Sequence, residues 1–186
     1  MIDQINILEG NLVRLIPFLA ERDSNFFAIS NRNSEYQRLA MADRAQQYSK
    51  DNIKKWFEKE ELSENEVFFM IQTLCNDRII GNINLEGLKN SNKNAFVGIS
   101  IGDPLDWGKG FGTDAMSIIL KYGFDILNLH RISLNVFEYN PRAIRSYEKV
   151  GFKHEGIQRK WVNRDGKRWD LIWMGILKRD WINSKN

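Results

Sequence analysis

A glycine-rich segment is the first place in this 186-residue sequence where residue types and spacing point to chemistry. Three glycines fall within five positions of Trp107–Thr113, between an expected strand and an expected long helix. Glycine lets the backbone turn tightly and approach a ligand closely. The helix that follows offers unpaired N–H groups and a positive dipole end, and Lys109 adds a cation. The segment therefore predicts a pyrophosphate-binding loop, with a plain strand-to-helix turn as the alternative.

Two better-known phosphate-binding patterns fail on this segment. A P-loop needs a glycine five positions before Gly108 and a Ser or Thr after Lys109, and the sequence has neither. A dinucleotide-binding GxGxxG pattern that starts at Gly108 meets Thr113 where its third glycine belongs. Only residues 139–186 follow the acidic Glu138, too few to complete a doubly wound domain. A nicotinamide-dependent oxidoreductase is therefore kept only as an alternative.

A second candidate segment runs from Asn140 to Phe152. Asn140 suits a helix N-cap, and Pro141 suits the first helical position. Tyr147 follows Asn140 by seven residues, close to two helical turns, so both lie on one helix face. A phenol in that position can reach a ligand that lies along the helix. The alternative is that Tyr147 is a half-buried core residue and Asn140 only a cap.

Together and in this order, the two segments resemble the GNAT acetyltransferase superfamily. WGKGFGTDA is similar to its pyrophosphate-binding signature, and NPRAIRSYEKVGF is similar to the helix-and-strand motif that follows. The opening LEGNLVRLIPF and the closing RDGKRWDLIWMGILKRDW resemble the branch of ribosomal-protein N-terminal acetyltransferases and spermidine acetyltransferases. The resemblance covers about Leu8 to Trp181, and Trp107 departs from the Gln or Arg of many members.

The resemblance implies acetyl-CoA as co-substrate and direct transfer of the acetyl group to a primary amine. It implies that Tyr147 protonates the departing thiolate and that the backbone of Ser100, Ile101 and Gly102 follows the pantetheine arm. The CoA-binding residues it implies besides these are Trp107, Gly108, Lys109, Gly110, Phe111, Gly112, Thr113, Asn140 and Ala143. A non-catalytic acyl-CoA-binding module is the other alternative.

The chemistry of amine acetylation agrees with these residue types. A phenol can donate a proton to a thiolate that leaves poorly by itself. The attacking amine must be neutral, and Glu86 and Glu138 are two candidate bases. Residues 25–48, expected to shape the acceptor pocket, carry several arginines and only two acids, Glu35 and Asp43. This charge balance favours a protein N-terminus or a small-molecule amine over a polycation such as spermidine.

The amino-acid composition narrows the classes of protein and of binding site that remain. The single cysteine, Cys75, cannot form an internal disulfide and is expected to be buried in a strand. With only His130 and His154 beside it, no zinc site of the usual Cys/His type is expected, and no metal cofactor. A net charge of +3 does not indicate a nucleic-acid partner. No membrane span or signal peptide is evident, so a cytoplasmic monomer or homodimer without a membrane partner is expected.

The hydrophobic patterns predict a single mixed α/β domain over residues 1–186, with a mostly antiparallel twisted sheet of about six to seven strands flanked by helices. Strands are expected at 11–18, 67–74, 78–85, 95–101, 131–137, 152–161 and 169–177. Helices are expected at 21–31, after Ser49, from the glycine-rich segment to Leu127, and between Asn140 and Gly151. Residues 31–48 are expected to form helical turns or a mobile loop.

Overall fold

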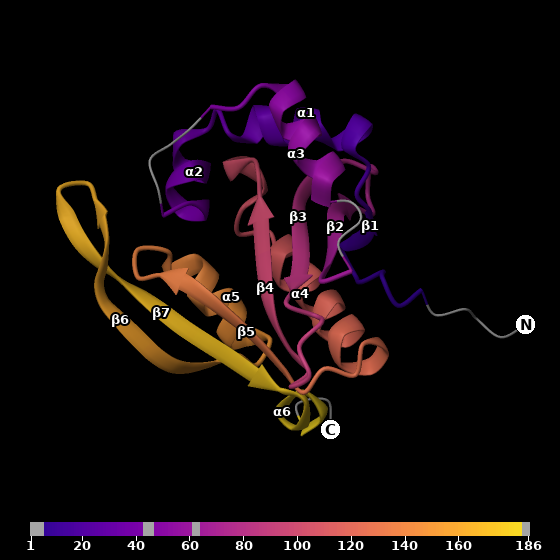
Figure 1. Cartoon of the computed structure of the whole chain (residues 1–186), viewed down its shortest axis with the longest axis vertical. Coiled ribbons are helices and arrows are strands. Elements are labelled where there is room, and N and C mark those ends of the chain that lie inside the picture. The colour runs from indigo at the N-terminus through magenta and orange to yellow at the C-terminus, as the bar shows by residue number, and fades with distance from the viewer. Residues whose placement is uncertain (1–5, 43–46, 61–63, 184–186) are drawn as a thin grey trace, which may run out of the picture.

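The computed structural model describes residues 6–42, 47–60 and 64–183, with the backbone alone for residues 56–60. Seven strands form one sheet in the order β1-β2-β3-β4-β5-β7-β6 (Figure 1). They are β1 (Val13–Pro17), β2 (Glu66–Thr73), β3 (Ile79–Glu86), β4 (Asn94–Ile101), β5 (Arg131–Phe137), β6 (Lys153–Arg164) and β7 (Lys167–Leu177). All neighbours are antiparallel except β4 and β5. The expected fold class is confirmed.

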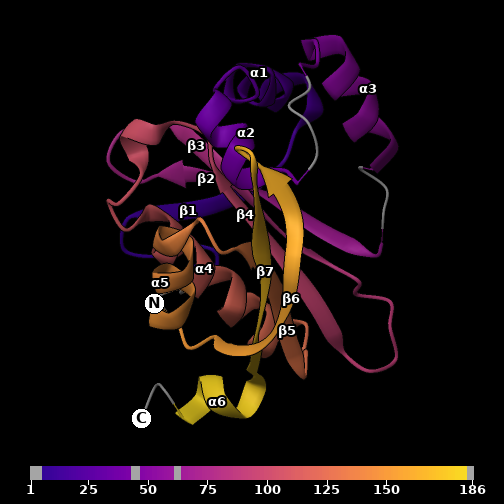
Figure 2. The same cartoon turned by 90° about the vertical axis from the view of Figure 1, so that its left-hand side faces the viewer.

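Helices cover both sides of this sheet. They are α1 (Ala20–Ser30), α2 (Ser34–Ala40), α3 (Lys50–Glu60), α4 (Phe111–Lys121), α5 (Pro141–Lys149) and α6 (Lys178–Asn183). Figure 2 shows α4 and α5 together on one face, whereas α1, α2 and α3 gather around the opposite face near the end of β4. The sheet therefore separates two compartments, one bounded by α4 and α5 and the other by α1 and α2.

Helix α4 forms the centre of the main core. Met116, Ile119 and Leu120 are fully buried against alternate residues of the central strands, such as Ile83 and Leu85. The spacing of these helix residues predicted the buried face, because positions three and four apart share one side of a helix. The strand residues between the buried ones point to the other face, since side chains alternate along a strand. The position of α4 is thus set by burial of its apolar stripe.

A second, smaller core holds α1 and α3 on the opposite face. Phe27 of α1 packs with Met70 of β2 and Ile53 of α3 in a cluster of buried side chains. Phe18 and Phe68 add aromatic contacts, with their ring centroids 5.5 Å apart. This cluster fixes α1 over the sheet, and α2 follows it after a three-residue connection.

Strands β4 and β5 pair in parallel over three positions only, from Asn94↔Arg131 to Phe96↔Ser133. Beyond them the strands diverge and open a split in the sheet (Figure 1). The N–H of Gly102 donates to the carbonyl of Ile80 at 2.9 Å. Because hydrogen-bonding groups alternate along a strand, the N–H and C=O groups of the even-numbered residues near the end of β4 point to β3. The backbone groups of Ile99 and Ile101 consequently point into the split.

Several expected boundaries were wrong in informative ways. Of the two alternatives for residues 31–48, the helical one is correct over residues 34–40, which form helix α2. This helix begins at an N-cap, since the Asn33 side chain accepts the N–H of Tyr36. The predicted turn at 163–166 shrinks to Asp165-Gly166, since β6 and β7 extend farther than expected. The long helix ends at Lys121 and continues as a wider π-helical turn over Tyr122–Ile126. The short helix α6 was not predicted.

Cys75 corrects another expectation. It is exposed in the connection between β2 and β3 rather than buried in a strand. Apolar residues on both sides of the turn made the run look continuous in sequence. In the structure the ladder ends at Thr73, whose hydroxyl bonds to Asn76 and Arg78 and closes the turn.

Candidate active site

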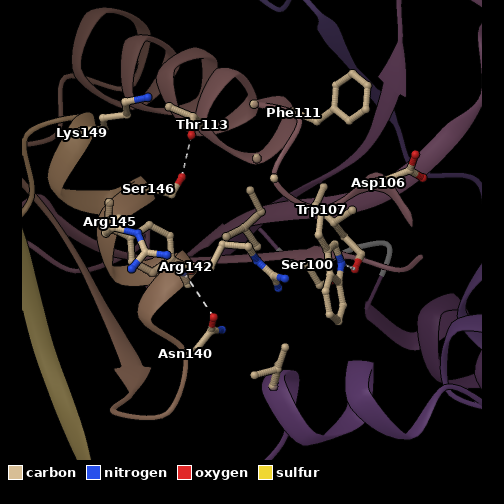
Figure 3. A pocket seen from close by; sticks show the side chains of 18 of the residues that line it. Ser100, Asp106, Trp107, Phe111, Thr113, Asn140, Arg142, Arg145, Ser146 and Lys149 are labelled. Atoms are coloured by element: carbon tan, nitrogen blue, oxygen red, sulfur yellow. Dashed lines mark hydrogen bonds between the residues drawn. The ribbon is translucent and has the colours of Figure 1, made fainter. Parts of the chain in front are cut away.

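A cavity of about 680 Å³ lies where β4 and β5 diverge. Its walls come from β4, the glycine-rich loop, the start of α4, α5 and one face of α2 (Figure 3). The predicted site residues that line it are Ser100, Ile101, Trp107, Gly108, Gly110, Phe111, Gly112, Thr113, Asn140, Ala143 and Tyr147. The glycine-rich segment and the segment that starts at Asn140 are separated by more than 20 residues in sequence, and they thus meet at one site. Gly102 and Lys109 were also predicted, but neither lines the cavity.

The glycine-rich loop has the geometry that its sequence predicted. Gly108 and Gly110 adopt φ of +74° and +90°, the left-handed region where side chains are strained. Gly110 is the N-cap of α4, so the free N–H groups of the helix begin beside it. Thr113 and Ser146 join their hydroxyls at 2.7 Å and hold α4 against α5 (Figure 3). The loop therefore leaves an open backbone surface of N–H donors at the cavity.

Three cations on α5 give the cavity a positive charge. Arg142, Arg145 and Lys149 all line it, and none forms a salt bridge among the described residues. Glu35 acts electrostatically on Arg142, and Glu148, which is paired with His154, also lines the cavity. The buried acid in the wall, Asp106, is neutralised by two hydrogen bonds of 2.8 and 2.7 Å from Arg78. An anionic ligand fits this balance, because unpaired cations beside helix N–H groups attract phosphate.

Sequence reasoning missed these three cations, although their signal was present. Arg142, Arg145 and Lys149 are spaced by three and four residues, so they share one side of α5. Asn140 and Ala143 on the same helix line the cavity as predicted, and the Asn140 side chain caps the N–H of Ala143 at 3.2 Å.

Trp107 closes the end of the split. Its indole N–H donates to the Ile101 carbonyl at 2.8 Å, and the Arg142 guanidinium lies 3.9 Å from its ring centroid. Figure 3 shows Arg142 reaching from α5 to Trp107 across the cavity. Burial lowers the pKa of Arg142 from its ordinary value. The residue whose side chain departs from the common family pattern therefore links the two walls.

Trp107→Phe tests this link, because phenylalanine keeps a ring under Arg142 but loses the hydrogen bond to Ile101. We expect the free energy of unfolding to fall by about 1 kcal/mol, the usual net value of one hydrogen bond. Urea denaturation measures the change. Trp161→Phe is the matched control, since Trp161 is half exposed and lies on β6 away from this cavity. Equal losses in both variants would contradict the role of the indole N–H.

The strand register corrects one detail of the expected site. The backbone groups of Ser100 and Gly102 point to β3, so they cannot face a ligand in the split. The backbone groups of Ile99 and Ile101 face the split instead, although the Ile101 carbonyl is already bonded to Trp107. Ile99 was missed because the sequence of β4 does not reveal which of its neighbours lies on which edge.

Tyr147 projects from α5 into the cavity with a free hydroxyl. Its ring packs beside Phe152, with ring centroids 6.1 Å apart, and the phenol oxygen has no hydrogen-bond partner among the described residues. Burial raises the pKa of Tyr147 to about 12, and the nearby Arg142 partly opposes this rise. The phenol is therefore protonated at neutral pH and has a hydrogen available for donation.

The two acids considered as bases lie elsewhere. Glu138 accepts the N–H of Asp170 at 3.0 Å and is tied to β7. Glu86 is exposed at the far end of β3, opposite Phe96 rather than near the split. Neither lines the cavity. A different phenol, Tyr36 of α2, was not predicted but lies in the wall beside Ser100.

Comparison with known proteins agrees with this geometry. A family model described as Acetyltransferase (GNAT) domain matches residues 13–153, a span that contains β1 to α5 and both site segments. The chain belongs to the GNAT acetyltransferase family. Membership excludes the oxidoreductase alternative and makes the chain an N-acetyltransferase that acts on an amine.

The relatives of this GNAT protein include enzymes with named acceptors. The Bacillus subtilis protein named "Probable N-acetyltransferase YjcK" is 31% identical over 94% of this chain and 98% of its own length. Spermidine N(1)-acetyltransferase of Vibrio cholerae is 39% identical over 43% of this chain and 46% of its own length. A solved structure of the Vibrio cholerae spermidine N-acetyltransferase with CoA and spermine has a TM-score of 0.82 at 27% identity, covering 92% of this chain and 98% of that one.

None of the helices in the described residues is long and apolar enough to cross a membrane. No group of three or more His, Cys, Asp or Glu side chains within the described ranges is arranged to hold a metal ion.

Proposed function

We propose that this GNAT protein binds acetyl-CoA in the cavity between β4 and β5 and passes the acetyl group directly to a primary amine. The observation that carries the proposal is the meeting, in one cavity, of the left-handed Gly110 at the start of α4 and the phenol of Tyr147, which has no hydrogen-bond partner among the described residues. The N–H groups at the start of α4 can bind phosphate, and the Tyr147 phenol can donate a proton. Both are needed for this reaction.

The cavity residues fit the parts of acetyl-CoA in order. The N–H groups at the start of α4 suit the pyrophosphate, and Arg145 and Lys149 add positive charge on the same side. The N–H groups of Ile99 and Ile101 face the split and suit an extended amide-containing arm. Gly110 adopts the αL backbone conformation of this loop without the strain that a side chain would add.

Residues of this chain also supply the expected chemistry. Bound acetyl-CoA brings the acetyl group as a thioester. A backbone N–H of β4 in the split can donate to the carbonyl oxygen, which gains negative charge as the amine attacks. Tyr147 can then hold its hydroxyl proton toward the leaving sulfur. No covalent bond to the enzyme is needed in this arrangement.

The acceptor in our proposal is a primary amine of a small molecule or of a protein N-terminus. The relatives named for spermidine make that compound the first to test. The charges near α2 argue against a preference for polycations. Glu35 and Asp165 lie 3.7 and 2.9 Å from Arg38, so this arginine already balances the two carboxylates that could attract a polycation. Asp43, the other acid considered in the sequence, lies outside the described residues. We further propose a cytoplasmic monomer or homodimer that needs neither nucleic acid, membrane nor metal.

Donor binding is tested by thermal unfolding with added ligands. We expect acetyl-CoA and CoA to raise the melting temperature, whereas NADH and ATP leave it unchanged. A ligand that binds only the folded protein stabilises it by about 2.7 kcal/mol when present at 100 times its Kd. A shift with NADH and none with CoA would overturn the proposed donor site.

A further inference from the structure

Three side chains form a hydrogen-bonded chain at the edge of the cavity that faces α2. The phenol oxygen of Tyr36 lies 3.1 Å from Ser100 Oγ, and Ser100 Oγ donates to Asn82 Oδ1 at 2.5 Å. These residues come from α2, β4 and β3, which the sequence places far apart. Tyr36 and Ser100 both line the cavity, although Tyr36 is only 6% exposed.

The direction of these hydrogen bonds follows from the number of hydrogens that each hydroxyl group carries. A hydroxyl group has one hydrogen, and that of Ser100 is used in the bond to Asn82. Tyr36 must therefore donate its own hydrogen to Ser100. The Tyr36 oxygen is left with lone pairs only, so toward the cavity it can accept a hydrogen bond but cannot donate one.

Tyr36 keeps the hydrogen that this direction requires. Burial raises the pKa of Tyr36, and the hydrogen bond with Ser100 opposes this rise only in part. The phenol therefore keeps its hydrogen at neutral pH, and the hydrogen stays committed to Ser100.

The two cavity phenols lie on different sides of the sheet. Ile99 and Ile101 pack on the core around α4, and so do Ala143 and Tyr147 of α5. Ser100 and Asn82 are opposite each other in the register and alternate with those core residues, so their side chains point to the α2 face. A donor arm in the split would thus have Tyr147 on one side and Tyr36 on the other.

We propose that Tyr36 receives the attacking amine, accepting a hydrogen bond from the amine N–H, while Ser100 and Asn82 hold its own hydrogen away. This inference rests on the proposed function. A neutral amine attacks through its lone pair, which must point at the acetyl carbon. A hydrogen-bond acceptor that binds the amine N–H orients the amine and leaves its lone pair free. A hydrogen-bond donor would occupy that lone pair. The ligand class is a neutral primary amine, and Ser100 and Asn82 are positioning residues.

The first test is Tyr36→Phe, which removes the oxygen and keeps the ring. We expect kcat/KM for the amine to fall at least 10-fold, while the melting-temperature shift with acetyl-CoA keeps its wild-type size. Tyr122→Phe is the matched control, since this tyrosine packs against Phe69 outside the cavity, and its kcat/KM should not change.

The second test uses the direction of the hydrogen bonds. Ser100→Ala leaves the Tyr36 hydrogen without its acceptor, so the phenol can bond to the amine lone pair instead. We expect a loss in kcat/KM for the amine comparable to that of Tyr36→Phe. The double variant should be no slower than the slower single variant, because the two residues act as one unit. Ser100→Ala also keeps the proposal testable if Tyr36→Phe fails to fold.

The outcomes separate this inference from the function on which it rests. A wild-type enzyme that acetylates amines, with a Tyr36→Phe variant equally fast, overturns the inference alone. Additive losses in the double variant, or a loss of acetyl-CoA affinity in place of amine efficiency, also overturn it. A wild-type protein that acetylates no amine overturns both.

Discussion

Tyr147→Phe is expected to lower kcat by roughly 100-fold or more, the typical contribution of a positioned proton donor. The phenol hydroxyl faces the cavity without a partner among the described residues, so phenylalanine removes one donor and little volume. Acetyl-CoA binding should be nearly unchanged, and its melting-temperature shift should persist. This combination marks an interaction that is made mainly in the transition state. Steady-state kinetics with an identified amine measures the change.

The pKa of Tyr147 also predicts how the wild-type rate depends on pH. Because burial raises this pKa to about 12, the phenol remains protonated throughout the neutral and moderately alkaline range. Ionisation of Tyr147 therefore should not produce a fall in wild-type rate below about pH 11. If Tyr147 is only a packing residue, the phenylalanine variant should stay within a few-fold of wild type when chemistry limits the rate. That result would contradict its role as the acid.

Gly110→Val is expected to abolish the melting-temperature shift with acetyl-CoA and to raise KM for acetyl-CoA at least 100-fold. Gly110 has φ of +90° at the N-cap of α4, and an added Cβ would lie 3.2 Å from Leu12 Cδ1. A β-branched side chain strains this backbone, and relief of the strain displaces the N–H groups that are proposed to receive the pyrophosphate. Thermal unfolding with and without the ligand measures the first effect, and donor kinetics the second.

Gly166→Val separates ligand loss from backbone strain. Gly166 has φ of +70° in the turn between β6 and β7, and an added Cβ would meet no atom within 4 Å. The two variants therefore share the backbone penalty, but only Gly110 borders the cavity. We expect Gly166→Val to melt earlier than wild type yet to retain its full shift with acetyl-CoA. Equal loss of the shift in both variants would mean that general destabilisation explains the result.

Local sequence signals predicted those elements whose ends and faces depend on nearby residues. The strand Arg131–Phe137 has its predicted bounds, and the helix after Asn140 begins at Pro141 because a cap and a proline define that start. For residues 31–48 the sequence left helical turns and a mobile loop as alternatives, because helix α2 is short and polar. Its position depends on contacts with distant segments, including the bond of the Tyr139 hydroxyl to the Arg38 carbonyl.

The site was predicted in its motifs but not in its details. Glycine positions and the Asn140–Tyr147 spacing are local, so the loop and the helix face could be read from the sequence. Which backbone edge of β4 faces the split depends on its register with β3, and this long-range pairing turns the backbone groups of Ile99, rather than those of Ser100, toward the split. The Tyr36–Ser100–Asn82 chain joins three separate elements and leaves no local signal.

Direct transfer of the acetyl group to an amine is tested by measuring thiol release from acetyl-CoA across a panel of amines. The panel contains spermidine, amino acids, aminoglycosides and peptides with free N-termini, and mass spectrometry identifies each product. We predict repeated turnover that requires both acetyl-CoA and an amine, yields the N-acetylated amine, and drops sharply in Tyr147→Phe. Thiol release that does not depend on any amine, or no release with protein that binds CoA, would contradict direct transfer to an amine in this cavity.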